Sequence, residues 1–328
     1  MRKRHRIGLL LAAACCAGPC AAQSLVAEVA WAYAITEGQA TPAPKDDGTL
    51  LTLPGAAKSF TLDQIRNRMG PADWFPGDHP SMPPVVAMGR QDAGIWACSL
   101  CHYPNGKGRP ENAGVAGLPK GYFIQQLEDF KNGLRHSAEP RKANTELMAG
   151  FAHQMTGEEM QQAADYFGAQ RWTKWIDVVE TDTVPKTRVD GGMHLKLEGA
   201  EAGTEPLGRR IVESPKSAKD TELLRNPHSS FIAWVPKGSI AAGEALAKGG
   251  GGKVTPCSVC HGDGFDGLAL VPTLRGRSPS YIARQLVDFK QGTRHGVWAP
   301  LMAPVVAKLS ADDILNLSAY LASLPPAK

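Results

Sequence analysis

Two pentapeptides with the same cysteine and histidine spacing contain the residues of this chain best suited to chemistry. They are Cys98–His102 (CSLCH) and Cys257–His261 (CSVCH). In a C-x-x-C-H segment the two thiols can add to the two vinyl groups of one porphyrin, and the adjacent histidine can bind the iron as its proximal ligand. The spacing predicts two covalently attached c-type haems, held by Cys98, Cys101, His102, Cys257, Cys260 and His261.

A cysteine pair with this spacing also occurs in redox dithiols and in zinc sites, so one copy alone leaves those alternatives open. Two copies followed by matching residues favour haem. Of the 7 cysteines, the 3 outside the motifs all lie within residues 1–22. If that segment is removed, no thiol remains for a disulfide, a catalytic nucleophile or a further iron ligand.

Residues 1–22 have the layout of a secretory signal peptide, with a basic start, a short apolar run and small residues before a cleavage site expected after Ala22. The apolar run is too short to cross a bilayer by itself. Lipid attachment at Cys15 is an alternative. The layout predicts export from the cytoplasm, with membrane association left open.

Cleavage would also change the charge balance. It would leave 32 of the 36 Lys and Arg residues against 32 Asp and Glu residues. A chain with this balance gives no indication of nucleic-acid binding. No other stretch is long and apolar enough for a transmembrane helix.

The chain contains an internal repeat. Tyr122 and Tyr281 each lie 24 residues after the first cysteine of their motif, and residues 122–136 match residues 281–295 at many positions. The spacing of apolar residues predicts one helix in each copy, ending near Gly133 and Gly292.

Each copy is also expected to end in a second helix. Thr156 and Ser310 are hydroxyl N-caps followed by first-turn acidic residues, which suit the positive start of a helix. In the second copy residues 239–247 are expected to form a helix before the motif, and Gly243 would allow it to cross closely over the helix that contains Tyr320.

These patterns predict a mainly α-helical fold with two repeat domains and two further regions that lie outside the repeats. The expected segments are a signal peptide (1–22), an N-terminal arm (23–85), a first domain (86–169), a β-rich insert (170–238) and a second domain (239–328). Within the insert, short strands are expected in 178–189, 193–198, 208–213 and 229–235, with a turn at 190–192. We expect the arm and the insert to pack together as a small β module, and a loosely ordered linker is the alternative.

The sixth iron ligands are expected to be Met148 and Met302, which coincide when the repeats are aligned. A thioether favours Fe(II) and raises the reduction potential. His136 and His295 also match and are alternative ligands, whereas His153 has no counterpart. Met155 and Met160 are expected to be core residues. Arg135 and Arg294 are expected either to pair with haem propionates or to lie on the surface.

The proximal imidazoles need an acceptor for their second ring nitrogen. A backbone carbonyl 11 residues after the histidine could serve, at Pro272 in the second copy and at Ala113 in the first.

With these residues the chain resembles the diheme cytochromes of the cytochrome c4 type, which have two class I cytochrome c domains in tandem. The resemblance covers about 86–168 and 239–325. It rests on the two motifs, Pro272, the Gly-x-Arg segments, Met148, Met302 and the helices ending near Tyr166 and Tyr320.

The resemblance implies a periplasmic electron carrier with His/Met haems. It would be reduced by a dehydrogenase or a quinol-oxidising complex and oxidised by a terminal oxidase. The arm and the insert depart from the tandem pattern and point to a dedicated partner.

Two other functions remain as alternatives. A diheme enzyme, peroxidase-like or thiosulfate-dehydrogenase-like, needs an open or displaceable iron ligand. The thiosulfate enzymes use a cysteine ligand, and no spare cysteine lies outside residues 1–22. The first haem stays open to this alternative if Met148 does not bind. A haem-based sensor or assembly subunit would use the insert as its working part.

Overall fold

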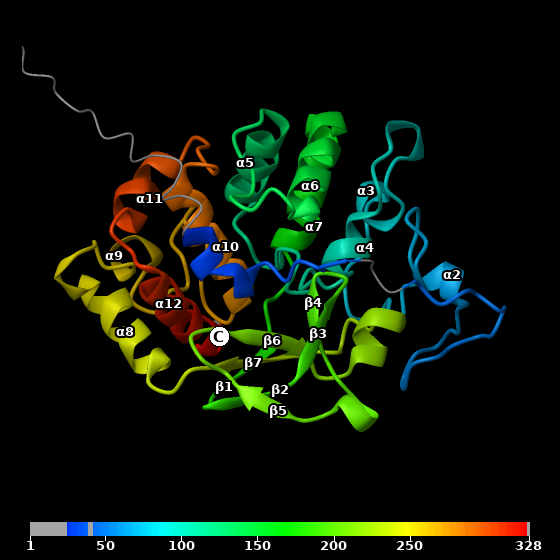
Figure 1. Ribbon diagram of the computed structural model, residues 1–328. Coiled ribbons are helices and arrows are strands. Elements are labelled where there is room, and N and C mark those ends of the chain that lie inside the picture. Colours follow the sequence, from blue (N-terminus) through cyan, green and yellow to red (C-terminus); the bar gives the residue numbers. More distant parts are fainter. Residues whose placement is uncertain (1–24, 39–41, 327–328) are drawn as a thin grey trace, which may run out of the picture.

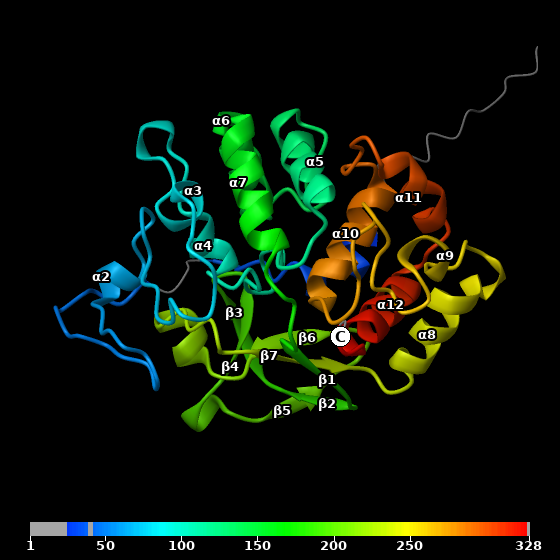
Figure 2. The ribbon, with the colours of Figure 1, turned by 180° about the vertical axis from the view of Figure 1, so that it is seen from behind.

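The computed structural model describes residues 25–38 and 42–326. The expected signal peptide and its cleavage site lie outside these residues. Helices form an upper layer and short strands a lower one (Figure 1), and the view from behind shows the same two layers with the two helical domains side by side (Figure 2).

The first domain contains five helices, one of which is the first motif itself. They are α3 (Pro84–Ala87), α4 (Cys98–His102), α5 (Lys120–Lys131), α6 (Ala143–Gln154) and α7 (Gly157–Gly168), with the 3₁₀ turn η2 (Gln91–Ala93) before α4. The expected cap at the start of α7 is confirmed, because the Thr156 hydroxyl accepts from the Glu159 backbone N–H and the Glu159 carboxylate accepts from the Thr156 N–H. This domain has its own apolar core, which includes Val86, Met160 and Phe167.

The second domain repeats this arrangement. Its helices are α8 (Ser239–Gly249), α9 (Ser258–His261), α10 (Pro279–Gln291), α11 (Ala299–Val306) and α12 (Ala311–Ser323), with the 3₁₀ turn η5 (Gly250–Gly252) after α8. The capping box at Ser310 and Asp313 is confirmed. α8 crosses α12 at Gly243, where an added Cβ would lie 2.0 Å from the Asn316 carbonyl oxygen. The expected close crossing is therefore confirmed.

The insert forms seven short strands. They are β1 (Ile176–Glu180), β2 (Thr183–Pro185), β3 (Thr187–Asp190), β4 (Met193–Lys196), β5 (Thr204–Pro206), β6 (Val212–Pro215) and β7 (Phe231–Val235). Between them lie η3 (Gly199–Glu201) and the π-helical turn η4 (Lys219–Leu223). β7 pairs in parallel with β1 and antiparallel with β6, while β2 pairs with β5 and β3 with β4.

The expected strand over 178–189 is divided into three, because the chain changes partner twice within it. The turn at 190–192 is confirmed. Gly191 and Gly192 both adopt positive φ, as a two-residue hairpin turn between β3 and β4 requires.

The arm contributes no strand to these sheets within the described residues, so a β module built jointly from arm and insert is not confirmed. The start of the arm, with η1 (Ala30–Ala32), packs into the core of the second domain through Val29 and Tyr33. Its later part contains α2 (Leu62–Ile65) and forms a small core in which Trp74 donates to the Leu224 carbonyl of the insert at 2.8 Å. The arm therefore extends across the molecule rather than forming one unit.

A shared core joins the insert to both domains. Tyr103 of the first domain and Leu315 of the second pack with Trp175 and Phe231 of the insert. The Trp175 indole N–H donates to the Gly108 carbonyl of the first domain at 3.1 Å, and the Ser278 hydroxyl of the second domain donates to the buried Glu213 carboxylate of the insert at 2.7 Å. These contacts fix the insert against both domains.

The two domains also meet directly through matching residues. The His136 N–H donates to the Thr293 carbonyl at 2.8 Å, and the His295 N–H donates to the Leu134 carbonyl at 2.9 Å. This short antiparallel contact places Arg135 beside Arg294. Because each contact is made by equivalent residues of the two repeats, the domain interface has an approximate two-fold symmetry.

No helix within the described ranges is long and apolar enough to cross a membrane.

Candidate functional site

The first motif forms the short helix α4, which begins after a turn linked to α3. The Ala97 N–H donates to the Arg68 carbonyl, and the Cys98 thiol donates to the Val85 carbonyl at 3.4 Å. Burial raises the pKa of the Cys98 thiol to about 12 and that of the Cys257 thiol to about 11. Such thiols are protonated at neutral pH, which disfavours a reactive dithiol.

Both motif histidines are held in the same way. His102 Nδ1 lies 2.8 Å from the Ala113 carbonyl oxygen, and His261 Nδ1 lies 2.8 Å from the Pro272 carbonyl oxygen. The expected carbonyl acceptors are therefore confirmed. A carbonyl can only accept, so Nδ1 carries the proton and Nε2 remains available to a metal. Burial lowers the pKa of both imidazoles and keeps them neutral, as an iron ligand must be.

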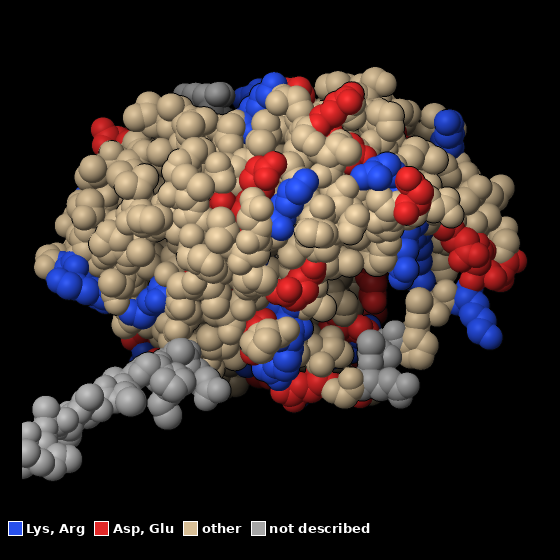
Figure 3. Space-filling view, turned by 90° about the horizontal axis from the view of Figure 1, so that it is seen from above, with Lys and Arg blue, Asp and Glu red and all other residues tan. Residues whose placement is uncertain are grey.

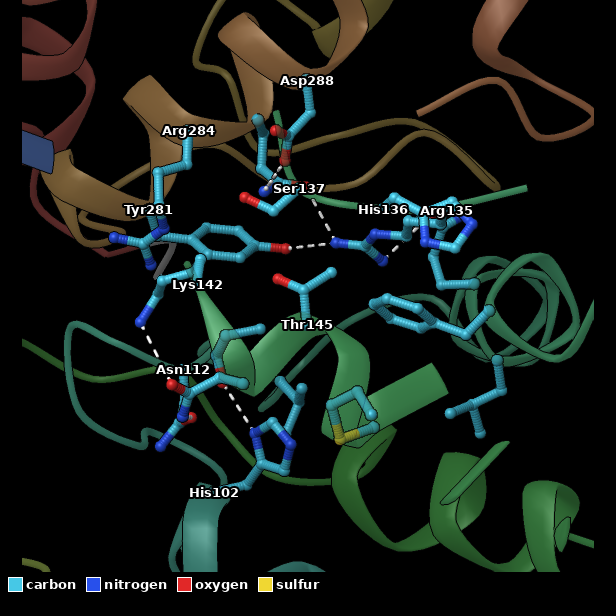
Figure 4. Close-up of a pocket in the computed structure, with 18 of the residues that line it drawn as sticks. His102, Asn112, Arg135, His136, Ser137, Lys142, Thr145, Tyr281, Arg284 and Asp288 are labelled. Carbon is cyan, nitrogen blue, oxygen red and sulfur yellow. Dashed lines mark hydrogen bonds between the residues drawn. The ribbon is translucent and has the colours of Figure 1, made fainter. Parts of the chain in front are cut away.

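A cavity opens beside His102 in the first domain (Figure 4). Met148 on α6 lines the same cavity, so the structure brings the expected proximal and distal ligands to one space. The apolar part of the lining consists of Val115, Leu118, Phe123, Leu127 and Phe130. A cavity that an imidazole, a thioether and apolar side chains line together is suited to a porphyrin ring.

The opposite wall of this cavity is polar and contains side chains from both domains. Lys142 and Arg135 come from the first domain, and Tyr281 and Arg284 come from α10 of the second (Figure 4). Burial and the nearby Arg284 guanidinium lower the pKa of Lys142 to about 7. A buried group of cations is suited to negative charge, so the residues present fit the carboxylates of a haem as well as its ring.

Sequence reasoning did not find Arg284 or Lys142. Arg284 stands where the first repeat has Gln125, and this departure from the repeat was a usable signal. It donates to the Ala32 carbonyl of the arm and to the Pro110 carbonyl of the first domain, both at 2.6 Å. It therefore ties three parts of the chain together at the edge of the cavity.

In the second domain, Met302 and Cys257 pack against the same apolar core as Leu274 and Phe289. Both expected methionine ligands lie within helices, Met148 in α6 and Met302 in α11. Residues 143–149 (ANTELMA) contain several good helix formers and no proline, whereas α11 has Pro304 within it.

The histidines considered as alternative ligands are engaged or exposed. His136 contacts the Glu146 carboxylate through Nδ1 at 3.1 Å and the Gly133 carbonyl through Nε2 at 3.0 Å, although it lines the cavity. His295 is exposed and contacts the Gly292 carbonyl. His153 is also exposed. None of the three is both buried and held by a backbone carbonyl through Nδ1, as His102 and His261 are.

Burial distinguishes core from surface positions for two methionines and two arginines of the repeats. Met155 and Met160 are buried in the core of the first domain, as expected. Arg135 and Arg294 are also buried and are not surface residues. Each donates to glutamine and tyrosine side chains at the domain interface, and Arg135 also lines the cavity.

Within 25–38 and 42–326, no cluster of three or more His, Cys, Asp or Glu side chains could hold a metal ion by itself. The four cysteines of the motifs are free thiols. Each motif therefore offers two thiols and one imidazole, which is the set that a covalently attached haem requires and one ligand short of a zinc site.

No family model matches the chain. The chain is 36% identical over 166 residues to a cytochrome c4 from Stutzerimonas stutzeri, covering 43% of this chain and 76% of that protein. It is 26% identical over 236 residues to a thiosulfate dehydrogenase electron acceptor from Thiomonas intermedia (strain K12), covering 70% and 79%. The crystal structure of reduced recombinant cytochrome c4 from Pseudomonas stutzeri aligns with a TM-score of 0.46 at 23% identity, covering 71% and 95%.

The match to the Stutzerimonas stutzeri protein includes most of that relative and agrees with the two motifs and their equivalent histidine contacts. The chain therefore belongs to the cytochrome c4 family of diheme c-type cytochromes, with two covalently attached haem c groups.

Proposed function

We propose that this diheme electron-transfer cytochrome works in the periplasm, with His102 and Met148 binding one iron and His261 and Met302 binding the other. The observation that supports the ligand assignment best is the cavity lined by both His102 and Met148. The alignment of the repeats supports the same pair in the second domain. With both axial positions filled, neither iron has room for a substrate.

Each haem would supply a one-electron couple, and the protein controls its surroundings. The Ala113 and Pro272 carbonyls orient the two imidazoles and increase their basicity. The apolar wall of the cavity would exclude water from the iron. Arg135, Lys142 and Arg284 would hold the propionates of the first haem through charge-assisted hydrogen bonds.

We further propose that the electrons come from a periplasmic dehydrogenase or a quinol-oxidising complex and pass to a terminal oxidase. One relative is named as the electron acceptor of a thiosulfate dehydrogenase, which supports a dehydrogenase as the donor class. The layout of residues 1–22 supports export.

The second candidate is a diheme enzyme whose first iron has a displaceable ligand. What favours it is the position of the cavity, because Lys142, Asn144 and His136 place polar groups close to the first haem site. A peroxidase-like or thiosulfate-dehydrogenase-like reaction would need Met148 to leave the iron.

Optical spectra of the oxidised and reduced protein separate the two functions. The carrier requires weak near-infrared sulfur-to-iron absorption corresponding to two haems, and no spectral shift when carbon monoxide is added to the reduced protein. A carbon monoxide complex at one haem in the unmodified protein would contradict the carrier and support the enzyme.

A further inference from the structure

The helix that carries Met302 is weakly held by its own domain. Of the eight residues of α11, only Ala299 and Val306 are buried. Pro304 lies inside the helix and lacks the N–H that would bond to the residue four positions earlier. A helix this short has little stability of its own and depends on packing against its neighbours. The position of Met302 therefore depends on what α11 packs against.

The two ends of α11 are held differently. After its last turn, the Lys290 ammonium group donates to the Ala307 carbonyl at 2.5 Å. The start has no such support, because residues 296–307 contain no Asp, Glu, Lys or Arg and the N-cap Trp298 makes no side-chain capping bond. The space-filling view shows a broad surface with few charged side chains over the second domain (Figure 3). The start of α11 is therefore positioned by contacts other than ion pairs.

The start of α11 makes an aromatic contact with the first domain. The Trp298 ring stacks on the Tyr122 ring, with centroids 6.3 Å apart and 16° between the planes. Trp298 precedes Met302 by four residues, and Tyr122 lies in the first turn of α5. Both ribbon views place α5 on the side of the first domain that faces α10 and α11 (Figure 1, Figure 2). Ring pairs at this separation stabilise a contact beyond the area that they bury.

Tyr122 is itself fixed at the domain interface. Its hydroxyl accepts from the Arg294 guanidinium at 2.8 Å. Arg294 is buried and also donates to the Gln126 side chain of α5 at 2.6 Å. The first domain therefore offers Trp298 a ring that is held in place by separate bonds.

The first domain positions its own methionine differently. Asn144 precedes Met148 by four residues, as Trp298 precedes Met302. The Asn144 side chain donates to the Asn112 side chain at 2.9 Å, and Asn112 donates to the Cys101 carbonyl at 3.2 Å. All of these groups belong to the first domain. The contact that stands before Met148 is therefore internal to its domain, whereas the one before Met302 crosses to the other domain.

We propose that Tyr122 and Trp298 are positioning residues for the distal ligand of the second haem. Their stack holds the start of α11 against the first domain and so keeps Met302 on the iron. This inference rests on the proposed function, because it takes Met302 to be an iron ligand. Contact between the domains then controls ligand exchange at the second haem and not at the first.

Competition with imidazole measures how firmly Met302 is held. In a Met148→Ala background, the remaining near-infrared sulfur-to-iron absorption belongs to Met302 alone. Titrating the oxidised diheme protein with imidazole and following this absorption gives an apparent Kd. Imidazole binds only when Met302 is off the iron, so this Kd falls as the dissociated fraction rises. We expect Trp298→Ala to lower it about tenfold, because the ring contact is lost.

A variant in the other domain tests the same contact independently. Tyr122→Leu removes the other ring and should lower the Kd by a similar factor. Combining it with Trp298→Ala should change the Kd by less than about twofold more, because the contact is already lost. Trp298→Phe keeps a ring and should restore most of the affinity of Met302 for the iron. Additive effects of the two single variants would overturn the proposal, since the rings would then act separately.

Two controls separate this role from a general loss of stability. Phe75 of the arm stacks on His228 of the insert, with centroids 4.0 Å apart and 17° between the planes, so Phe75→Ala removes a comparable contact and should leave the Kd unchanged. In a Met302→Ala background the remaining absorption reports on Met148, and Trp298→Ala should have no effect on it. Equal weakening of both methionines would refute a specific role.

Failure of the proposed function gives a different result. If the Met148→Ala protein had no sulfur-to-iron absorption, Met302 would not be a ligand and the His/Met assignment would be wrong. If the absorption were present and neither Trp298→Ala nor Tyr122→Leu changed the Kd, the positioning role would be refuted and the carrier function would stand.

Discussion

The orientation of His102 and His261 is the residue-level feature on which the haem sites depend. In each case a backbone carbonyl 11 residues further along the chain binds Nδ1 and leaves Nε2 for a metal. The carbonyl belongs to Pro272 in one repeat and to Ala113 in the other, so the contact depends on the path of the backbone and not on the side chain. That is why the sequence could predict it from spacing alone.

Replacing Met302 with alanine should open the second iron. The reduced variant is expected to bind carbon monoxide, and the near-infrared sulfur-to-iron absorption should fall to about half because one of two thioether ligands is lost. Optical titration with carbon monoxide measures both effects. The control is Met155→Ala, which removes a buried core methionine, lowers stability by about 2 to 4 kcal/mol and leaves both bands in place. An unchanged spectrum in Met302→Ala would refute the ligand assignment.

At the residue scale, the sequence predicted the attachment residues and the carbonyl acceptors but not the polar wall of the cavity. The motif encodes its chemistry in five consecutive residues. Arg284 and Tyr281, in contrast, reach the first haem site from the other domain. A contact between residues about 140 or more positions apart leaves no local pattern, so only the structure could find it.

Among the elements, the crossing of α8 and α12 holds the second domain together. An added Cβ at Gly243 would be 2.0 Å from the Asn316 carbonyl oxygen and 2.7 Å from the Tyr320 Cβ. Both of these are parts of a helix and cannot move independently. The crossing therefore requires glycine at this position.

Gly243→Ala should lower the free energy of unfolding by about 3 kcal/mol, because the helices must separate to admit the methyl group. Gly249→Ala in the same helix is the control, since nothing lies within 4 Å of its added Cβ. It should raise stability by up to about 1 kcal/mol through the helix propensity of alanine. Urea unfolding followed by tryptophan fluorescence measures both, and equal effects would contradict a close crossing.

The contact of β6 with α10 predicts a dependence of stability on pH. Burial raises the pKa of Glu213, against the hydrogen bonds that it accepts from Ser278 and Ser280. A raised pKa in the folded state means that protonated Glu213 favours folding and that this contribution is lost as the pH rises above the unfolded value of about 4.3.

Glu213→Gln should therefore become more stable relative to the unmodified protein as the pH increases from 4 towards 8. Urea unfolding at a series of pH values measures the difference. Glu198→Gln is the control, because it removes an exposed carboxylate from the same insert. A difference between Glu213→Gln and the unmodified protein that stays constant with pH would contradict the raised pKa.

The helices were predicted well because their caps and apolar spacing lie within single segments, as at Thr156 and Ser310. The insert was predicted less well. Its strands are short, and residues 178–189 change partners between β1, β2 and β3. Alternation of apolar residues indicates a strand but does not identify its neighbour.

In the whole molecule, the two domains are joined by a symmetric set of hydrogen bonds. The Gln126 carbonyl oxygen accepts from Arg135 and from Arg294, at 3.0 and 2.6 Å. The Gln285 carbonyl oxygen accepts from the same two residues, at 2.8 and 3.0 Å. Because both guanidinium groups are buried, these acceptors hold the domains together.

Gln126→Leu and Gln285→Leu should each destabilise the protein by about 2 to 4 kcal/mol, and by similar amounts, because each removes one acceptor that two buried guanidinium groups share. Gln125→Leu is the control: it loses one bond, to Asp129 of its own helix, and should cost about 1 kcal/mol or less. Thermal unfolding followed by haem absorption checks all three. Unequal losses in the first two would contradict the two-fold symmetry of the interface.

At this scale, the tandem arrangement of two cytochrome c domains was predictable from the repeat, but the role of the extra segments was not. Residues 23–85 and 170–238 have no counterpart within the chain against which they could be aligned. The arm joins two separate cores. Tyr33 packs with residues of the second domain, and Trp74 packs with Leu224 of the insert, and both partners are far from the arm in sequence.

The strand pairing within the insert has one more consequence. In the sequence, β1 and β2 precede the turn at 199–201, and their partners β7 and β5 follow it. If the polypeptide were divided at that turn, each piece would carry one haem motif and strands that need the other piece. Two separately synthesised halves should therefore reassemble into a single diheme particle, much as a split reporter does.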